Sequence, residues 1–379
     1  MALTKKEMKK TVRDPAILFM IFLFPVVFVF AFGASLGGVG EGQPAYNIGV
    51  VNLDQATSVN ASQILLAALL DTNILNVQTY VDNQTAQNGL SQGSLQGVMI
   101  IPSSFSQSFV SFQAAPNDPN MWTNATITLY LDKGSLIATQ AIPPIIQQVL
   151  TELADQNQPA IPNPFSLETA SLVEVDALSP FDFMVPGMFT FASIFLIMMV
   201  AQSFTQDREN GMMKRIRITP TTPAEFMTSQ VLSYMVIALV QAVLVFVMVY
   251  FMGFRPDVGL PVYGFAFVLV LVFTLSNVGF GLITATIAKS SGAATGLSFL
   301  FVLPQLFLGT FVGSSLSSTA QIAGKIVPSY YVTDALTSLL LRGAAITSTT
   351  VLLDIAVVSV SCVVILAVGI LLYGKYYKI

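Results

Sequence analysis

The stretch FMTSQVLSYMVIALVQAVLVFVMVYFMGF, residues 226–254, contains no Lys, Arg, Asp or Glu. A helix needs about 20 apolar residues to cross the hydrocarbon core of a bilayer, so this stretch predicts a membrane-spanning helix. The whole chain has the same character, because 54% of its 379 residues are hydrophobic and 9% are charged. This composition excludes a water-soluble globular protein of this length and predicts an integral membrane protein.

Six segments are long and apolar enough to cross a membrane. They are residues 16–36, 183–204, 226–254, 262–287, 292–312 and 355–373. The first segment follows a basic stretch, as a signal peptide would, but its apolar run is longer than the roughly 7 to 15 residues of a signal peptide. We therefore expect a retained first helix, and six spans place both termini on one side of the membrane.

The basic residues favour a cytoplasmic location for both termini. In that orientation 12 of the 16 Lys and Arg residues lie inside, as the positive-inside rule requires. Lys133, Arg255, Lys325 and Arg342 are the four that lie outside. The sequence therefore predicts a polytopic α-helical protein of the cell membrane.

Residues 37–182 differ in composition from the rest and are expected to fold outside the membrane. They carry twelve acidic residues and one basic residue, a formal net charge of −11, which is typical of a solvated surface. The apolar strand pattern of residues 47–53 ends at Asp54, and helical spacing follows at residues 62–70. The same patterns predict strands at 75–81, 98–101 and 127–131 and helices at 85–96, 104–112 and 137–154. This alternation predicts an extracellular α/β domain, which the Pro-rich residues 156–164 link back to the membrane.

Few features of this domain indicate a ligand or a modification. Its three N-x-S/T sequons, at Asn60, Asn83 and Asn124, are candidate glycosylation sites, although one or two would arise by chance. The chain has no His, and its one Cys, Cys362, lies in the last span. We therefore expect neither a disulfide framework nor a metal site.

The polar residues 206–225 concentrate charge in a predicted cytoplasmic loop. Within it, Thr222, Pro223 and Glu225 form a capping box that starts the third span. Residues 207–217 are expected to form a short helical elbow at the membrane surface. Gly211 in this elbow would permit a turn or the close approach of another backbone.

The order of residues in this loop resembles that of the type 2 ABC exporter permeases. Arg208-Glu209-x-Gly211, followed by Lys214-Arg215 and Thr219-Pro220, is similar to the cytoplasmic loop of that family. Other segments agree in order and position, and the resemblance covers nearly the whole chain. Residues 5–15 resemble its interfacial entry helix, residues 47–54 and 98–105 the large external domain of one subgroup, and residues 328–336 with Arg342 its external re-entrant segment.

The resemblance implies a permease subunit of an ATP-driven exporter, which forms a pore with a second permease copy, identical or similar. The chain has no phosphate-binding loop, because Ala323-Gly324-Lys325 lacks both the earlier Gly and the following hydroxyl residue. ATP and Mg²⁺ are therefore expected on a separate cytosolic ATPase, and the chain itself is expected to be neither an enzyme nor a nucleic-acid binder. The residues expected to couple it to the ATPase are Arg208, Glu209, Gly211, Lys214, Arg215 and Pro220; on charge alone, the basic ones would instead contact anionic lipid.

Polar residues within the spans are candidates for a substrate path. They are Gln202, Gln241, Asn277 and Gln305, although hydrogen bonds between helices explain such residues more often. Tyr331, Asp334 and Arg342 are candidates for an external gate, or for bracing of the re-entrant segment. Because no acidic or basic residue is predicted deep in a span, the sequence disfavours an ion-coupled carrier. It favours a hydrophobic or amphipathic substrate, such as a drug, lipid, peptide or glycan.

The expected organisation has three parts. An interfacial helix and the first span occupy residues 1–36, the extracellular domain and its linker 37–182, and five further spans 183–379, with the coupling loop 206–225 and the re-entrant segment 313–350. Two other functions stay open. A surface receptor or adhesion protein would use the external domain, but needs fewer than six spans, and a channel or secondary carrier would need charge at mid-membrane.

Overall fold

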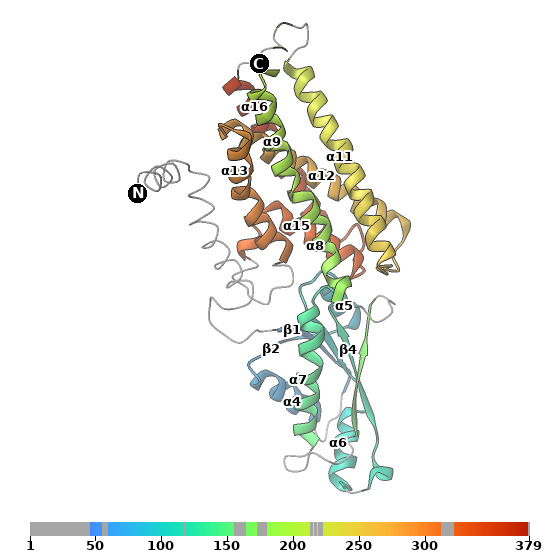
Figure 1. Ribbon diagram of the computed structural model, residues 1–379. Coiled ribbons are helices and arrows are strands. Elements are labelled where there is room, and N and C mark those ends of the chain that lie inside the picture. Colours follow the sequence, from blue (N-terminus) through green and yellow to red (C-terminus); the bar gives the residue numbers. More distant parts are fainter. Residues whose placement is uncertain are drawn as a thin grey trace, which may run out of the picture. The chain divides into compact units, whose positions relative to one another are not determined.

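The structure is a computed structural model that describes residues 46–54, 60–116, 118–154, 164–172, 180–212, 215, 218, 223–311 and 322–377 (Figure 1). The chain divides into two compact units. An α/β unit contains residues Glu41–Phe183 and Thr337–Thr349, and a helical unit contains residues Met184–Leu336 and Thr350–Ile379. The predicted first span, residues 16–36, lies outside the described residues.

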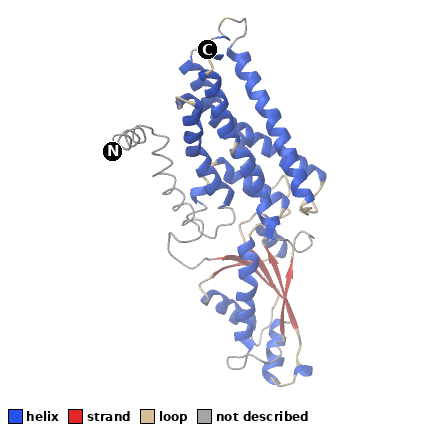
Figure 2. Cartoon of the chain, viewed as in Figure 1, coloured by secondary structure: helices blue, strands red, loops and turns tan. Residues whose placement is uncertain are grey.

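A five-stranded sheet forms the centre of the α/β unit (Figure 2). Its strands are β1 (Tyr46–Asn52), β2 (Leu75–Tyr80), β3 (Gly97–Ile101), β4 (Ala125–Leu131) and β5 (Phe165–Ala170). They lie in the order β2-β1-β3-β4-β5, with β3 and β4 antiparallel and the other neighbouring pairs parallel. After β1 the chain continues to β2 on one side of the sheet, and after β3 it continues to β4 on the other side. The chain therefore leaves the carboxyl ends of β1 and β3 in opposite directions.

Helices cover both faces of this sheet. They are α4 (Ala61–Asp71), α5 (Asn83–Ser91), α6 (Phe105–Ala114) and α7 (Leu136–Ala154), with a short 3₁₀ helix η2 (Pro119–Met121) before β4. α4 contacts both α6 and α7, which form one layer with it. α5 packs on the face that carries Val51 and Val98. Burial on both faces explains why β1 and β3 are almost continuously apolar.

The predicted alternation of strands and helices is observed, with three differences. The helix expected at 85–96 begins at Asn83, because Asp82 Oδ1 accepts a hydrogen bond from the Thr85 amide at 2.8 Å, and ends at Ser91. β5 was not predicted, because half of its side chains are solvated and it has no run of apolar residues. Residues 337–349, which were predicted to belong to the membrane part, pack within the α/β unit.

The helical unit contains long apolar helices. They are α8 (Pro180–Ile194), α9 (Leu196–Glu209), α11 (Pro223–Phe251), α12 (Leu260–Ile287), α13 (Ser291–Pro304), the π-helix η3 (Gln305–Phe311), α15 (Pro328–Leu340) and α16 (Thr349–Tyr377). Within the described part of the chain, five stretches are long and apolar enough to cross a membrane: 181–209, 231–251, 260–287, 291–310 and 349–373. They match the last five of the six predicted spans.

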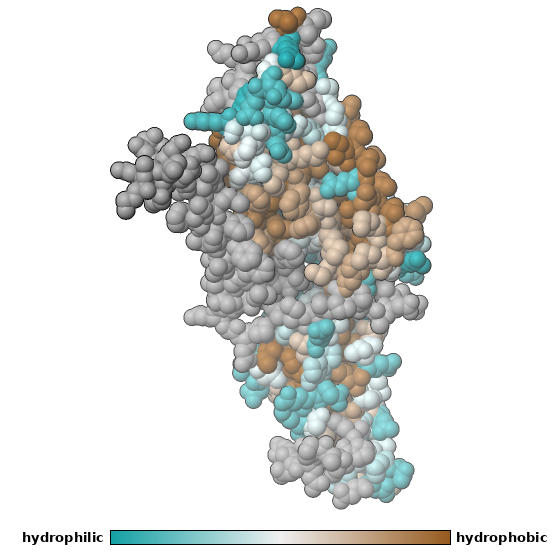
Figure 3. Space-filling model, in the orientation of Figure 1, coloured by the Kyte–Doolittle hydropathy of each residue, from teal (hydrophilic) through white to brown (hydrophobic). Residues whose placement is uncertain are grey.

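α9 and α12 lie at the centre of this unit. α9 contacts both α12 and α13, and a buried cluster joins Val200 and Phe204 of α9 to Val278 of α12 and Tyr373 of α16. Of the most apolar 18-residue stretch of α12, 61% is buried, whereas only 17% of the corresponding stretches of α11 and α16 is buried. Hydrophobic side chains therefore cover the surface of α11, as Figure 3 shows, and this surface suits an apolar surrounding.

The ends of three helices refine the sequence predictions. α11 begins at Pro223, as the capping box predicts. α16 begins at Thr349 instead of residue 355, and therefore includes the buried Asp354. α9 continues to Glu209, so Asp207, Arg208 and Glu209 are the last turn of a membrane helix and not the start of a separate elbow.

Candidate functional site

The end of α9 is fixed by a turn at Gly211. This glycine has a φ of +70°, and its amide donates to the Arg208 carbonyl at 3.0 Å, an arrangement that often ends helices. A Cβ on Gly211 would have no neighbour within 4 Å, so this glycine serves the turn and not the close approach of a second backbone. Of the other predicted coupling residues, Arg215 is exposed, and Lys214 and Pro220 lie outside the described residues.

Arg208 binds the carboxyl end of α12. Its Nη1 donates to the Ala285 carbonyl at 3.1 Å, and its Nη2 donates to the Ala288 carbonyl. The last carbonyls of a helix have no partner within the helix and carry partial negative charge. The guanidinium therefore supplies both the donors and the positive charge that this helix end favours.

Glu209 binds the amino end of the next helix. Its Oε2 accepts from the Ser291 amide at 3.3 Å, and Ser290 Oγ accepts from the Ala293 amide at 3.2 Å. The free amides at a helix start favour an acceptor with negative charge. Two consecutive residues of opposite charge thus bind the two ends of one turn, residues 287–291, between α12 and α13. The carboxyl end of α9 therefore lies beside this turn. The predicted topology places both in the cytoplasm.

The four predicted path residues have different surroundings. Asn277 Nδ2 donates to the Ser193 carbonyl at 3.1 Å, and Gln305 Nε2 donates to Asn277 Oδ1 at 3.3 Å. Gln241 Nε2 donates to the Ala192 carbonyl at 2.7 Å, whereas Gln202 is exposed on α9. Three of the four therefore bind neighbouring helices, which is the simpler of the two interpretations.

A π-helix forms where α13 reaches this polar chain. Pro304 precedes it, and the carbonyl of Gln305 accepts from Ser329 Oγ of α15 at 2.8 Å. Gln305 is 2% exposed, and its Oε1 has no hydrogen-bond partner in the described structure. Single-turn π-helices inside α-helices are frequent at functional sites. Asn277 and Gln305 thus join α8, α12, η3 and α15 through one chain of hydrogen bonds.

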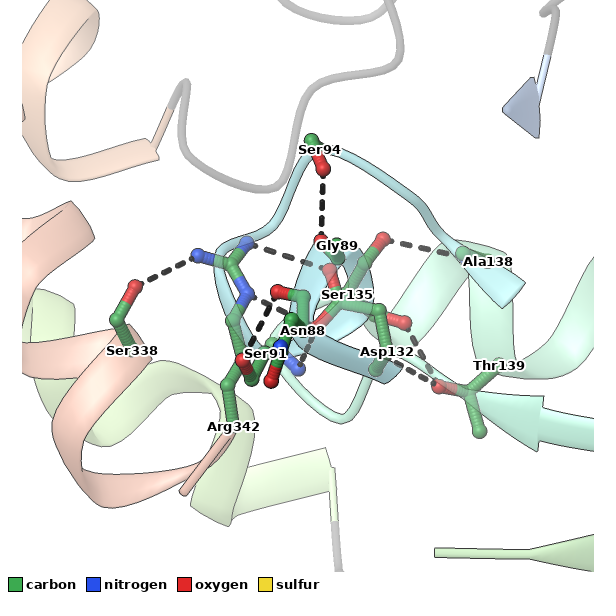
Figure 4. Close-up of polar contacts among 11 residues, drawn as sticks. Asn88, Gly89, Ser91, Ser94, Asp132, Ser135, Ala138, Thr139, Ser338 and Arg342 are labelled. Atoms are coloured by element: carbon green, nitrogen blue, oxygen red, sulfur yellow. Dashed lines mark hydrogen bonds and ion pairs between the residues drawn. The ribbon is translucent and has the colours of Figure 1, made fainter. Parts of the chain in front are cut away.

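The predicted gate residues belong to two different units of the structure. The Tyr331 hydroxyl donates to the Lys325 carbonyl at 2.9 Å, and Asp334 is half-buried on α15. Arg342, in contrast, lies in the α/β unit, where its Nε and Nη2 donate to Asp132 Oδ1 at 2.9 Å and Oδ2 at 3.2 Å (Figure 4). Both side chains are buried, at 7% and 1% exposure.

Two glycines lie against the Arg342 side chain and leave room for it. A Cβ at Gly93, whose φ is +72°, would lie 2.6 Å from Arg342 Cζ, and one at Gly134 would lie 2.7 Å from Arg342 Nε. Arg342 Nη1 also donates to Ser338 Oγ at 3.1 Å. Burial lowers the pKa of the adjacent Lys133 ammonium. Asp132 and both glycines were not predicted from the sequence; the sequence Asp132-Lys133-Gly134 directly after β4 is the one local signal that could have indicated them.

Other predicted sites have less structural support. Asn60, Asn83 and Asn124 are all exposed, as a glycan would require, although Ser62 of the first sequon is buried. Glycosylation stays a prediction. Across the described residues, no three His, Cys, Asp or Glu side chains are grouped so that they could hold a metal ion.

The long apolar helices and the neutral polar chain between them define a multi-pass helical membrane protein. Residues 15–371 match the family model described as "ABC-2 family transporter protein". The chain therefore belongs to the ABC-2 transporter family and is a membrane permease subunit of an ABC exporter in the cell membrane.

Curated relatives agree with this assignment. The chain is 24% identical over 328 residues to the "Probable multidrug ABC transporter permease YbhR" of Escherichia coli strain K12, over 82% of this chain and 80% of that protein. The same values hold for the protein of that name in E. coli O157:H7. In this family the ATPase is a separate chain.

Proposed function

We propose that this subunit exports hydrophobic or amphipathic compounds, driven by ATP hydrolysis on a separate cytosolic ATPase that binds Mg²⁺ and ATP. The observation that carries the proposal is the uncharged polar chain from Ser193 through Asn277 to Gln305. Amide side chains do not titrate at physiological pH, so this chain offers no acid or base to couple transport to protons.

The charged residues of the described spans support the same conclusion. They are Asp182, Asp207, Arg208, Glu209 and Asp354, and each lies within two turns of the end of its span. A proton- or ion-coupled carrier usually places such a residue near mid-membrane. ATP is therefore the energy source that best fits the interior of this protein.

The interior of the helical unit and the name of the relatives both support this substrate class. The helical unit has an apolar core with a few neutral hydrogen-bonding groups, which suits compounds that enter from the bilayer. The name of the E. coli relatives, multidrug permease, supports a small amphipathic substrate.

We infer that two permease copies assemble around the path. α11 and α16 bury little of their apolar surface within one chain, and a second copy and bilayer lipid would cover it. The ATPase would bind the loop 206–225, at Gly211, Lys214, Arg215 and Pro220, beside Arg208 and Glu209.

A ligand-binding receptor is less well supported. In α/β sheets, ligands usually bind at the carboxyl ends of strands where the chain direction switches, here β1 and β3. At this edge the buried Ser106 Oγ donates to Asp54 Oδ2 at 2.5 Å and accepts from the Ala61 amide at 3.1 Å. The groups that would bind a ligand there already bind one another.

Transport by the purified complex tests the proposal. The subunit is solubilised gently, the ATPase that accompanies it is identified by its phosphate-binding loop, and the complex is reconstituted into inside-out vesicles. ATP should drive accumulation of ethidium, a rhodamine or a fluorescent lysophospholipid, and a non-hydrolysable ATP analogue should not.

Two results would contradict the proposal. One is purification without any ATPase under conditions that keep the permease folded. The other is accumulation that proceeds without ATP and stops when the proton gradient is dissipated, which would identify a secondary carrier.

A further inference from the structure

The end of α9 is held to the turn between α12 and α13 by polar contacts on both sides of that turn. We name this arrangement the Arg208–Glu209 clamp; it consists of Arg208, Glu209, Ala285, Ala288 and Ser291. The positive side chain binds the carboxyl end of α12 and the negative one binds the amino end of α13. Each charge therefore opposes the partial charge of the helix end that it contacts.

Apolar packing next to the clamp holds the same three elements together. Ala201 of α9, Ala288 of the turn and Ala294 of α13 form one buried cluster, with Leu297 against it. Three alanines allow the backbones of these elements to approach closely. Ala285 is also fully buried, so its carbonyl would have no replacement for the Arg208 donor if the guanidinium were removed.

The two helices held by the clamp lead to the polar chain of the interior. α12 carries Asn277, and α13 continues directly into the π-helix that begins at Gln305. Asn277 and Gln305 are hydrogen-bonded to each other. A displacement of the end of α9 would therefore reach both members of this pair through continuous helices.

We propose that Arg208 and Glu209 are positioning residues that join the coupling loop and the α12–α13 turn into one moving body, and are not contact residues for the ATPase. The proposal rests on the proposed function, because it assumes that an ATPase pushes on the loop 206–225. It assigns ATPase contact to exposed neighbours that take no part in the clamp, such as Met212 and Arg215. The clamp then transmits the push to the π-helix.

Charge removal within the intact complex tests this role. Arg208→Gln and Glu209→Gln are compared with Met199→Ala, a control at an exposed position of the same helix outside the loop 206–225. The readouts are the amount of ATPase that co-purifies, the ATPase rate, and the change in hydrogen exchange of residues 305–311 when a non-hydrolysable ATP analogue binds. None of these readouts requires a known substrate.

In both clamp variants we expect normal co-purification of the ATPase and continued ATP hydrolysis. The nucleotide-dependent change in exchange at residues 305–311 should fall by about tenfold or more, since hydrogen bonds to charged groups are among the strong ones. The control should match the wild type. Loss of ATPase binding in Arg208→Gln or Glu209→Gln would show that these are docking residues, and an unchanged exchange response would show that the clamp transmits nothing; either overturns the inference.

A crosslink across the clamp gives an independent test that does not depend on stability of the charge variants. Glu209→Cys and Ser291→Cys are combined in a Cys362→Ala background and joined by a short thiol-specific crosslinker. If the loop and the turn move as one body, the crosslinked complex should keep its nucleotide-dependent exchange change. Loss of that change on crosslinking would overturn the inference, whereas absence of the change in the uncrosslinked wild type would instead contradict the proposed function.

Discussion

Arg342 and Asp132 lie 210 positions apart in the chain and form a buried, two-pronged ion pair. The pair attaches residues 337–349, which directly precede the last described span, to a sheet that comes before all five described spans. A buried ion pair contributes little over an apolar replacement, but the loss of one partner leaves an uncompensated charge. The α/β unit is thus completed by a segment that the chain contributes after four of the five described spans.

We expect removal of either partner to destabilise the α/β unit strongly. Arg342→Gln or Asp132→Asn should cost about 3–5 kcal/mol, because each leaves a buried charge without its partner. Thermal unfolding of the full-length protein in detergent, with protease cleavage within residues 60–172 as the probe, measures the effect. Asp71→Asn, at an exposed carboxylate of the same unit, is the control and should change nothing.

Combining Arg342→Gln with Asp132→Asn distinguishes a specific pair from general fragility. Two residues in direct contact should give a double variant that costs clearly less than the sum of the single variants. Additive costs would mean that the two side chains act separately and that the observed contact contributes nothing of its own.

A second prediction concerns the crossing of α12 and α16. A Cβ at Gly279 would lie 2.8 Å from Leu366 Cα, and one at Gly369 would lie 2.7 Å from the Gly279 carbonyl oxygen. Gly279→Ala should therefore push the two helices apart and cost about 1–3 kcal/mol, as overpacking does. The measurement is the midpoint of thermal unfolding of the helical unit in detergent.

Gly264 on the same helix provides the matched control. A Cβ there would meet nothing within 4 Å, so Gly264→Ala should leave stability unchanged or raise it by up to about 1 kcal/mol through helix propensity. Equal effects of the two substitutions would rule out a close helix crossing at Gly279.

The local architecture could be predicted from the sequence because its signals are local. The apolar run of residues 47–53 ends at Asp54, and β1 is Tyr46–Asn52. Pro223 in a capping box predicted the first residue of α11. Composition and span length in the same way predicted five apolar helices where the structure has them.

The contacts of the site could not be predicted because they join distant positions. Nothing near Arg342 in the sequence indicates Asp132, since a salt bridge has no period along the chain. Arg208 binds backbone carbonyls of Ala285 and Ala288, and any residue type supplies a carbonyl. β5 was missed because a half-solvated edge strand has a weak pattern.

A third prediction concerns the acid sensitivity of α5. Hydrogen bonds from the hydroxyl and the amide of Thr85 lower the pKa of the Asp82 carboxyl. Because the folded pKa lies below the unfolded value of about 3.9, the stability that Asp82 contributes is fully present above that value. It is lost as the pH falls through the folded pKa.

Hydrogen exchange of residues 83–91, corrected for the intrinsic effect of pH, measures this contribution. Protection of α5 should fall on acidification below about pH 4 in the wild type. Asp82→Asn keeps a good N-cap without a titrating group, so its protection should depend less on pH. An identical pH response in the two proteins would show that Asp82 does not control the start of α5.

The last prediction separates structure from transport at the polar chain of the membrane helices. Asn277→Leu removes the acceptor of the Gln305 Nε2 donor at a buried position and should cost about 1–3 kcal/mol, because an unsatisfied buried donor carries its full desolvation cost. Gln202→Leu, at an exposed position of α9, should cost almost nothing. Unfolding midpoints in detergent test both expectations.

The double variant Asn277→Leu with Gln305→Leu tests whether these two polar residues take part in transport or only stabilise the helix packing. Removing both partners leaves neither Asn277 Oδ1 nor Gln305 Nε2 unsatisfied, so stability should recover toward that of the wild type. If Asn277 and Gln305 only hold the helices together, ATP-driven accumulation of dye should recover together with the stability. We expect stability to recover while accumulation stays at least about tenfold below wild type, since the substrate path would have lost its hydrogen-bonding groups. Full recovery of accumulation would show that Asn277 and Gln305 do not take part in transport.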